Sequence, residues 1–233
     1  MKIAVCGCSF SSAIASHPGT HWSEILAAML GAELIQLARP GISNGGIRLQ
    51  MDEAVRRKPD WILCAATVED RTEFPRDPDR RTEGQVSFSD LNYEDHPDHK
   101  LISETLINVI DGPRNRKRTQ HITAEAREAV KQYAAFLYDP NWQRQKDRWM
   151  LNSGLWAMHD AGINFVYNPY LNTYGPTDMP QWFVDRYFVG VELGFNGVYH
   201  KHPLKSTDDP GYHISAEGQH ILAEGYYRLI KGN

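Results

Sequence analysis

The sequence predicts a three-layer α/β/α sandwich built on a parallel sheet. Short, continuously apolar segments alternate with segments of helical periodicity, and Gly or Pro marks several of the boundaries. Apolar runs of this length are typical of strands buried on both faces, and their alternation with helices favours parallel pairing. A chain of 233 residues, 41% of them hydrophobic, fits one large domain. We therefore expect a single domain over residues 1–233 with the flavodoxin-like strand order 2-1-3-4-5.

The first third of the chain has the pattern strand–helix–strand–helix–strand. The predicted strands are Lys2–Cys6, Glu33–Ala38 and Asp60–Ala66, and the predicted helices are Thr20–Leu30 and Ile47–Arg57. Gly31 ends the first helix and Pro59 follows the second, as helix stop signals do. The turns after the first two strands, Gly7–Ser12 and Arg39–Asn44, should meet at the carboxyl end of the sheet, where such folds build active sites.

The regular pattern breaks after the third strand. Residues 71–121 are polar and Pro-rich, and we expect an insertion without regular structure there, either functional or disordered. Regular elements then return, as helices at Thr123–Tyr138, Asn141–Ala161 and Gln181–Phe188 and a strand at Asn164–Tyr167. Ser215 is the predicted N-cap of the last helix.

Composition excludes several classes of protein. A net charge of -4 gives no reason to expect a nucleic-acid or anionic-membrane partner. The N-terminus is too short in apolar residues for a secretory signal, and no apolar run approaches the roughly 20 residues of a membrane span. The three cysteines, Cys6, Cys8 and Cys64, are typical of reduced cytosolic thiols. We expect a cytoplasmic protein.

Ser9, just past the first strand, is the candidate nucleophile. A single Ser in such a turn is more often a cap, so its partners decide the interpretation. Nucleophilic catalysis needs a base, a group that orients the base, and donors for an oxyanion. The segment "DDPGYHIS" supplies His213 as the base, with Asp208 and Asp209 upstream. The segment "RPGISN" in the second turn supplies the backbone N–H of Gly41 and the side-chain amide of Asn44.

These blocks resemble the SGNH hydrolase superfamily, also called GDSL-type esterases and lipases, and its phage- and bacterial-type members more than its lipases. The family's Gly-Asp-Ser corresponds to Gly7-Cys8-Ser9, the Gly of its second block to Gly41, and its final Asp-x-x-His to the segment ending at His213. The resemblance implies that Ser9 is the nucleophile and His213 the general base. It also implies that the N–H groups of Ser9 and Gly41 form part of an oxyanion hole.

The sequence departs from the family pattern at the acid of the triad. Asp209 lies four residues before His213 rather than three, and Pro210 holds the usual acid position. Asp209 could still orient His213, as could Asp208 or a backbone carbonyl.

The third block, Gly-x-Asn after strand three, is missing from "CAATVEDRTEF". Asn44 is the best substitute as an oxyanion donor and Thr67 a weaker one. Without a donor there, a loss of about 10²–10³ in rate is expected.

Other residues have ordinary explanations. Cys8 has no feature that favours it over Ser9 as nucleophile. The segments "EDHPDH" and "YHKHP" contain metal-ligand residue types, but their irregular spacing favours solvated loops, and we expect no metal and no cofactor. Four arginines after the third strand could bind an anionic substrate, although solvation is the simpler interpretation: Arg71, Arg76, Arg80 and Arg81.

The sequence therefore predicts a serine hydrolase of carboxylic esters, with a small-molecule or glycan ester as substrate. A short acyl group, such as O-acetyl on a sugar, fits the polar insertion better than a lipid does. The alternative is a catalytically degenerate binding or structural module. A distance of about 3–3.5 Å or less between Ser9 Oγ and a ring nitrogen of His213 would favour the enzyme.

Overall fold

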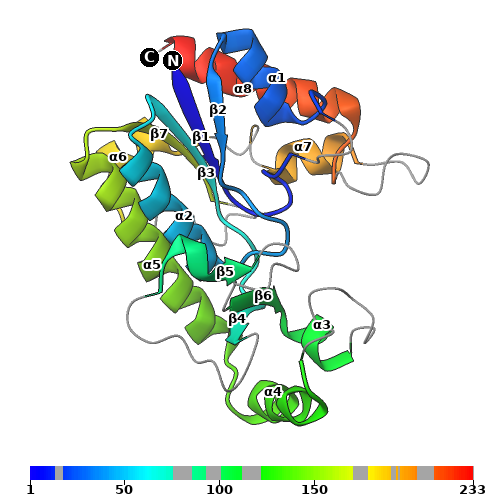
Figure 1. Ribbon diagram of the computed structural model, residues 1–233. Coiled ribbons are helices and arrows are strands. Elements are labelled where there is room, and N and C mark those ends of the chain that lie inside the picture. The colour runs from blue at the N-terminus through cyan, green and yellow to red at the C-terminus, as the bar shows by residue number, and fades with distance from the viewer. Residues whose placement is uncertain are drawn as a thin grey trace.

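A four-stranded parallel sheet forms the centre of the protein (Figure 1). The computed structural model describes residues 1–13, 18–75, 86–92, 101–111, 122–169, 178–189, 193, 195–203 and 213–232. The strands are β1 (Lys2–Cys6), β2 (Glu33–Gln36), β3 (Trp61–Ala65) and β7 (Asn164–Asn168), in the order β2-β1-β3-β7. This order confirms the first four positions of the predicted sheet. At the fifth position, the described residues contain a single parallel bridge between Tyr167 and Phe188.

Helices cover both faces of this sheet, which confirms the three-layer prediction (Figure 1). On one face lie α1 (Trp22–Leu30), α7 (Phe195–Lys201) and α8 (Ala216–Gly232), and on the other α2 (Asn44–Arg57), α5 (Pro140–Asp160) and α6 (Gln181–Tyr187). Side chains of β1 alternate between the two cores. Ile3 and Val5 pack toward α1 and α8, while Ala4 and Cys6 pack toward α2 and α5.

Helix ends follow the local signals of the sequence. Gly31 ends α1 in the left-handed conformation, with φ of 59°. Ser215 caps α8, since its Oγ accepts the Gly218 N–H at 3.2 Å. The helix predicted from Ile47 begins earlier, at Asn44, because the Ser43 side chain caps it by accepting the Gly46 N–H. Helix α7 was not predicted.

The expectation of an irregular insertion over residues 71–121 is wrong for its described parts. They form β4 (Arg71–Pro75), η1 (Phe88–Asp90), β5 (Leu91–Asn92), β6 (Leu101–Thr105) and α3 (Leu106–Asp111), and α4 (Ala124–Phe136) follows. A small sheet of order β4-β6-β5 lies beyond the carboxyl edge of the main sheet (Figure 1). The sequence of β4 is too polar to show the apolar pattern of a strand. This segment is a strand because it pairs with β6, about 30 residues later in the chain.

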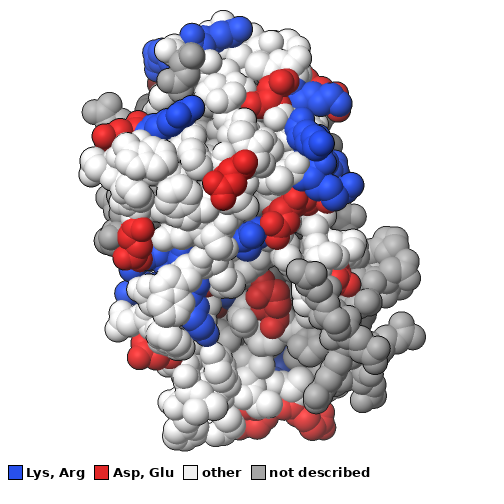
Figure 2. Space-filling model, turned by 90° about the vertical axis from the view of Figure 1, so that its left-hand side faces the viewer, with Lys and Arg blue, Asp and Glu red and all other residues white. Residues whose placement is uncertain are grey.

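The surface mixes charges of both signs. On the face turned to the viewer in Figure 2, basic and acidic side chains lie interspersed among uncharged residues. Within the described residues, no helix combines the length and apolar character that a membrane span requires.

Candidate active site

The turn after β1 presents Ser9 at the carboxyl edge of the sheet. Its backbone bends at Gly7, whose φ of 150° disfavours any residue with a side chain. A Cβ on Gly7 would also lie 2.6 Å from Ser11 Oγ and 3.3 Å from the Ala65 carbonyl oxygen. The Ser11 N–H then donates to the Cys8 carbonyl at 2.9 Å, which closes a tight turn with Ser9 at a corner. The glycine before Cys8 is therefore a steric requirement of the turn.

Gln50 of α2 holds this turn through Gly7. The Gly7 N–H donates to Gln50 Oε1 at 2.6 Å, and Gln50 Nε2 donates to the Gly7 carbonyl at 3.3 Å. Because Gln50 is fully buried, these bonds are shielded from water. The Arg39 N–H also donates to the Gly7 carbonyl, at 3.0 Å, which ties the turn after β2 to the turn after β1.

Phe10, next to Ser9, is fixed from the other side of the sheet. Its carbonyl accepts the Trp22 indole N–H at 2.8 Å and lies 3.2 Å from His21 Nε2. His21 Nδ1 accepts the Ser23 N–H at 3.3 Å, so its proton belongs on Nε2, which donates to Phe10. Burial lowers the pKa of His21 to about 4, which keeps this ring neutral at neutral pH.

The structure brings Ser9 and His213 together, although 204 residues separate them in the chain. Ser9 Oγ lies 2.7 Å from His213 Nε2, and the Phe10 ring stacks on the imidazole at 4.1 Å between centroids. Burial first, and then the charge of Arg71, lower the pKa of His213 below its ordinary value. The imidazole is therefore neutral at neutral pH and can accept the proton of Ser9.

Helix α7 and the cap of α8 position His213. Ile214 pairs with Pro203, just after α7, in an antiparallel bridge. The Ser215 N–H donates to the His202 carbonyl at 3.0 Å, and Ser215 then caps α8. His213 is thus anchored by the residues that follow it. The predicted acids, Asp208 and Asp209, lie outside the described residues.

Gly41 lies in the turn after β2, as the sequence predicts. The Ile42 N–H is 3.4 Å from the Arg39 carbonyl, and Gly41 has φ of 77°, so Arg39–Ile42 forms a type II turn with Pro40 at its second position. This geometry explains the Pro-Gly pair. The role of the Gly41 N–H as an oxyanion donor remains a prediction.

The side chain of Asn44 is fully engaged within the protein. Its Nδ2 donates to the Thr67 carbonyl at 3.0 Å and to Asp147 Oδ2 at 2.9 Å, and its Oδ1 accepts the Thr67 N–H at 2.8 Å. Asn44 and Asp147 are both almost completely buried. Two amide protons with two acceptors leave none for an oxyanion. We therefore assign Asn44 a different role from the predicted one, that of joining the turns after β2 and β3.

Arg71, the first residue of β4, lies between the same two turns. Its Nη1 donates to Thr67 Oγ1 at 2.7 Å and is 3.3 Å from the Ile42 carbonyl. The structure thus separates Arg71 from the solvated arginines with which the sequence grouped it. The other three, Arg76, Arg80 and Arg81, lie outside the described residues.

Comparison with known proteins identifies the architecture. No protein-family model and no curated protein matches the sequence. Solved structures do match. An acetyl xylan esterase, AlAXEase, has a TM-score of 0.52 at 9% identity, over 99% of this chain and 100% of its own. The psychrotrophic esterase EstA from Pseudoalteromonas sp. has a TM-score of 0.51 at 11% identity, over 99% and 97%. The chain has the GDSL-esterase fold.

A third structure belongs to the same group. It is described as a lipolytic protein of the G-D-S-L family from Desulfitobacterium hafniense DCB-2, and it matches with a TM-score of 0.50 at 11% identity, over 98% of each chain. The resemblance expected from the Gly-Cys-Ser block is therefore confirmed at the level of the fold. At such identities the likeness concerns the fold, and the chemistry rests on this chain's own residues.

Sequence patterns missed several residues that build this candidate site. Gln50 carried a usable signal, since it is a polar residue on the buried face of α2 beside Ile47, Met51 and Ala54. The contacts of His21 with Phe10 and of Arg71 with Ile42 gave no local signal, because these partners lie 11 and 29 residues away in the sequence. Cys8 is buried in the core, 1% exposed, which offers no support for a nucleophilic thiol.

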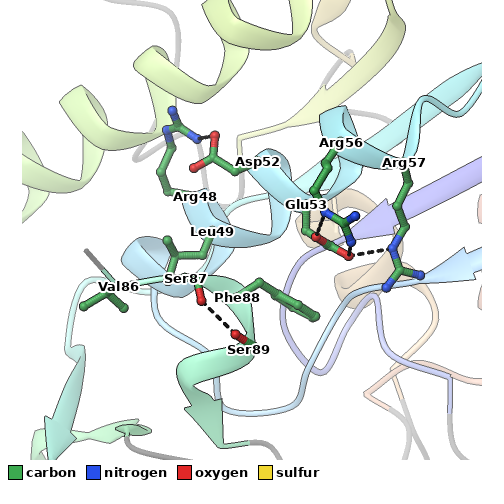
Figure 3. Close-up of a pocket in the computed structure, with 10 residues that line it drawn as sticks. All are labelled: Arg48, Leu49, Asp52, Glu53, Arg56, Arg57, Val86, Ser87, Phe88 and Ser89. Carbon is green, nitrogen blue, oxygen red and sulfur yellow. Dashed lines mark hydrogen bonds and ion pairs between the residues drawn. The ribbon is translucent and has the colours of Figure 1, made fainter. Parts of the chain in front are cut away.

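A separate cleft of about 820 Å³ lies between α2 and the segment around η1 (Figure 3). Neither Ser9 nor His213 lines it. Its charges pair with one another: Arg48 with Asp52, and Glu53 with the arginines of the last turn of α2. These pairs lower the pKa of Glu53 to about 2. We assign no ligand to this cleft.

Metal-ligand residue types do not gather in the described part of the chain. No group of three or more His, Cys, Asp or Glu side chains there could hold an ion. The "EDHPDH" segment lies outside the described residues. In the "YHKHP" segment, His202 Nδ1 lies 3.4 Å from Glu217 on α8.

Proposed function

We propose that the protein is a serine hydrolase of carboxylic esters that acts through an acyl-enzyme on Ser9. The contact of 2.7 Å between Ser9 Oγ and His213 Nε2 carries this proposal. Such a contact is within hydrogen-bond reach, as a nucleophile and its general base require. The GDSL-esterase fold supports it, because two solved structures of similar fold are esterases.

In the first step, Ser9 Oγ attacks the ester carbonyl while its proton passes to His213 Nε2. The new bond joins Oγ to the acyl carbon. The bond from that carbon to the alcohol oxygen breaks, and His213 returns the proton to the leaving alkoxide. In the second step, water attacks the acyl-enzyme, His213 accepts a proton from it, and Ser9 is released with its own proton restored. An acceptor alcohol in place of water would make the enzyme a transferase.

Two backbone N–H groups and one side-chain hydroxyl stabilise the oxyanion in this scheme. We propose the N–H groups of Ser9 and Gly41, which lie in adjoining turns, as two of them. Thr67 is the proposed third donor, since Asn44 is engaged and Arg71 already donates to Thr67 Oγ1, which leaves the hydroxyl proton to point elsewhere. Asp209, or Asp208, would orient His213.

For the substrate we propose a short acyl group on a sugar or another small alcohol. One neighbour of the fold is an acetyl xylan esterase, which acts on an ester of this kind. A glycan or small-molecule O-acetyl ester is therefore the first substrate class to test.

The test compares the wild type with Ser9→Ala on an aryl acetate. We expect kcat/KM to fall by at least about 10³ in Ser9→Ala, as removal of a nucleophile does. A fluorophosphonate should label the wild type and leave Ser9→Ala unlabelled. Circular dichroism serves as the folding control for the variant. Equal turnover by both proteins would contradict the proposal.

One observation favours a second function, that of a binding module with a retired active site. The third-block donor of the family is absent, and Asn44 cannot replace it while it holds Thr67 and Asp147. This alternative predicts no ester turnover and no fluorophosphonate labelling of the folded wild type. Labelling of Ser9 would eliminate it.

A further inference from the structure

We propose that Arg71 binds a carboxylate carried by the substrate, so that the ester hydrolysed at Ser9 is an anionic one. This inference deepens the proposed function and depends on it for the role of Ser9. The carboxylate could belong to the acyl part or to the alcohol part of the ester, and the experiment below separates these two cases.

The free edge of the Arg71 guanidinium has the geometry for a carboxylate. Nη1 is engaged by Thr67 Oγ1 at 2.7 Å and by the Ile42 carbonyl at 3.3 Å. The remaining edge is made of Nε and Nη2, whose parallel N–H groups match the two oxygens of a carboxylate. Nε is buried and, among the described residues, contacts no acceptor. A buried donor without an acceptor is costly, so a ligand that supplies one is favoured.

Among the described residues, the charge of Arg71 has no carboxylate partner, in contrast to that of four other arginines. Arg48 pairs with Asp52, Arg56 and Arg57 with Glu53, and Arg144 with Glu69 at 2.6 Å. No carboxylate of the described residues forms an ion pair with Arg71. The neighbouring Asp70 carboxylate feels its charge, but burial is the larger influence and raises the pKa of Asp70, and one of its oxygens has no hydrogen-bond partner.

Arg71 lies against the turns beside the one that carries Ser9. The two residues that accept its hydrogen bonds, Ile42 and Thr67, follow β2 and β3, the strands that flank β1. Ile42 is also next to the proposed oxyanion donor Gly41. The effect of its charge on His213 agrees with that position. We infer that a substrate anion bound by Arg71 would lie within the same group of turns as the ester under attack.

The test uses matched pairs of esters that differ in one charge. For the acyl side, the pair is 4-nitrophenyl hemisuccinate and 4-nitrophenyl butyrate. For the alcohol side, it is 3-acetoxypropanoate and 3-acetoxypropanamide, with acetate release measured. Each kcat/KM is divided by the rate with hydroxide to correct for intrinsic reactivity. We expect the wild type to favour the anionic member of one pair by about 10–100-fold.

Arg71→Met should reduce that preference to near one, and Arg71→Lys, which keeps the charge but loses the fork, should retain part of it. Arg56→Met is the matched control, because it removes the same charge from an exposed position at the far end of α2 and should leave the preference intact. Thermal unfolding of each variant checks that it is folded. A wild-type preference near one for both pairs, or an equal loss for both members in Arg71→Met, would overturn the inference.

Binding can be measured without turnover, which separates this inference from the proposed function. Ser9→Ala, which lacks the nucleophile, is titrated with monomethyl succinate and separately with 3-acetoxypropanoate, and binding is followed by NMR. One of the two esters should show saturable binding to Ser9→Ala that the double variant Ser9→Ala/Arg71→Met lacks. Fluorophosphonate labelling reports on Ser9 alone. Binding that depends on Arg71 supports the inference even if labelling fails, and labelling without any binding of the anion contradicts it.

Discussion

At the scale of single residues, the turn that carries Ser9 is held from both layers of helices. Gln50 fixes Gly7 from one layer of helices, and His21 with Trp22 fixes the Phe10 carbonyl from the other. The Phe10 ring in turn supports His213 by stacking. The proposed nucleophile and base are therefore positioned before a substrate arrives, which would lower the entropic cost of reaching the transition state.

The same residues predict the acid limb of the pH–rate profile. His213 must be neutral to act as a base, and its pKa lies below the ordinary value because of burial and of Arg71. Activity should therefore persist as the pH falls below about 6.5, the ordinary pKa of histidine, and decline only at lower pH. Arg71→Met removes one of the two causes of the low pKa of His213, so the acid limb of the pH–rate profile of this variant should move to higher pH. The measurement is kcat/KM of a neutral ester between pH 4 and 8, and a limb at or above 6.5 in the wild type would refute this account.

At the scale of elements, the most important contribution comes from the start of α8. The helix begins at Ala216, directly after its cap Ser215, and His213 lies two residues before that cap. The bridge from Ile214 to Pro203 joins the same segment to the end of α7. The position of His213, the proposed base, therefore depends on the start of α8 as well as on its own contacts.

Replacement of the caps of two helices tests this coupling. Ser215→Ala should lower the free energy of unfolding by about 1 kcal/mol, and because the cap also fixes His213, it should lower kcat by several-fold. Thr123→Ala is the control, since Thr123 caps α4 by accepting the Ala126 N–H at 3.2 Å, away from Ser9. It should cost similar stability with kcat unchanged. Equal kcat values for the two variants would show that the α8 cap does not position His213.

At the scale of the whole molecule, the insertion is joined to the main sheet through the start of α2. Ser43 Oγ and the Gly46 backbone donate to the buried carboxylate of Glu73 on β4, and burial raises the pKa of this group. Arg71 lies two residues before it on the same strand. The small second sheet therefore places Arg71 against the turns of the main sheet that form the candidate site.

Stability of the whole molecule should depend on pH through His21. Its pKa of about 4 in the folded protein is below the ordinary 6.5, so the unfolded chain takes up a proton that the folded one does not. This contribution is complete above pH 6.5 and is lost as the pH falls toward 4. Between pH 7 and 4, the free energy of unfolding should fall by about 3 kcal/mol more in the wild type than in His21→Asn, which can still cap α1. Denaturant unfolding at both pH values measures this difference. An equal fall in the free energy of unfolding in the two proteins would refute the prediction.

The sequence predicted those features that depend on local pattern. Apolar strands, the Gly31 stop and the Ser215 cap are each encoded within a few residues, and parallel topology alone placed the turns of Ser9 and Gly41 at one edge. It did not predict β4, because that strand is polar and becomes one only by pairing with β6. It also suggested Asn44 as an oxyanion donor, whereas its amide group donates to Thr67 and Asp147. These partners are distant in the sequence, so neighbouring residues do not reveal them.

The sequence by itself thus determined the layers, the order of the first four strands, and the identity of the candidate nucleophile and base. Only the tertiary structure decided that Ser9 and His213 touch, that Gln50 holds the glycine turn, and that Arg71 lies at the site rather than in solvent. The physical reason is the range of the interactions. Strand burial and helix capping act over a few residues, whereas these contacts join segments that only the packed sheet brings within hydrogen-bond distance.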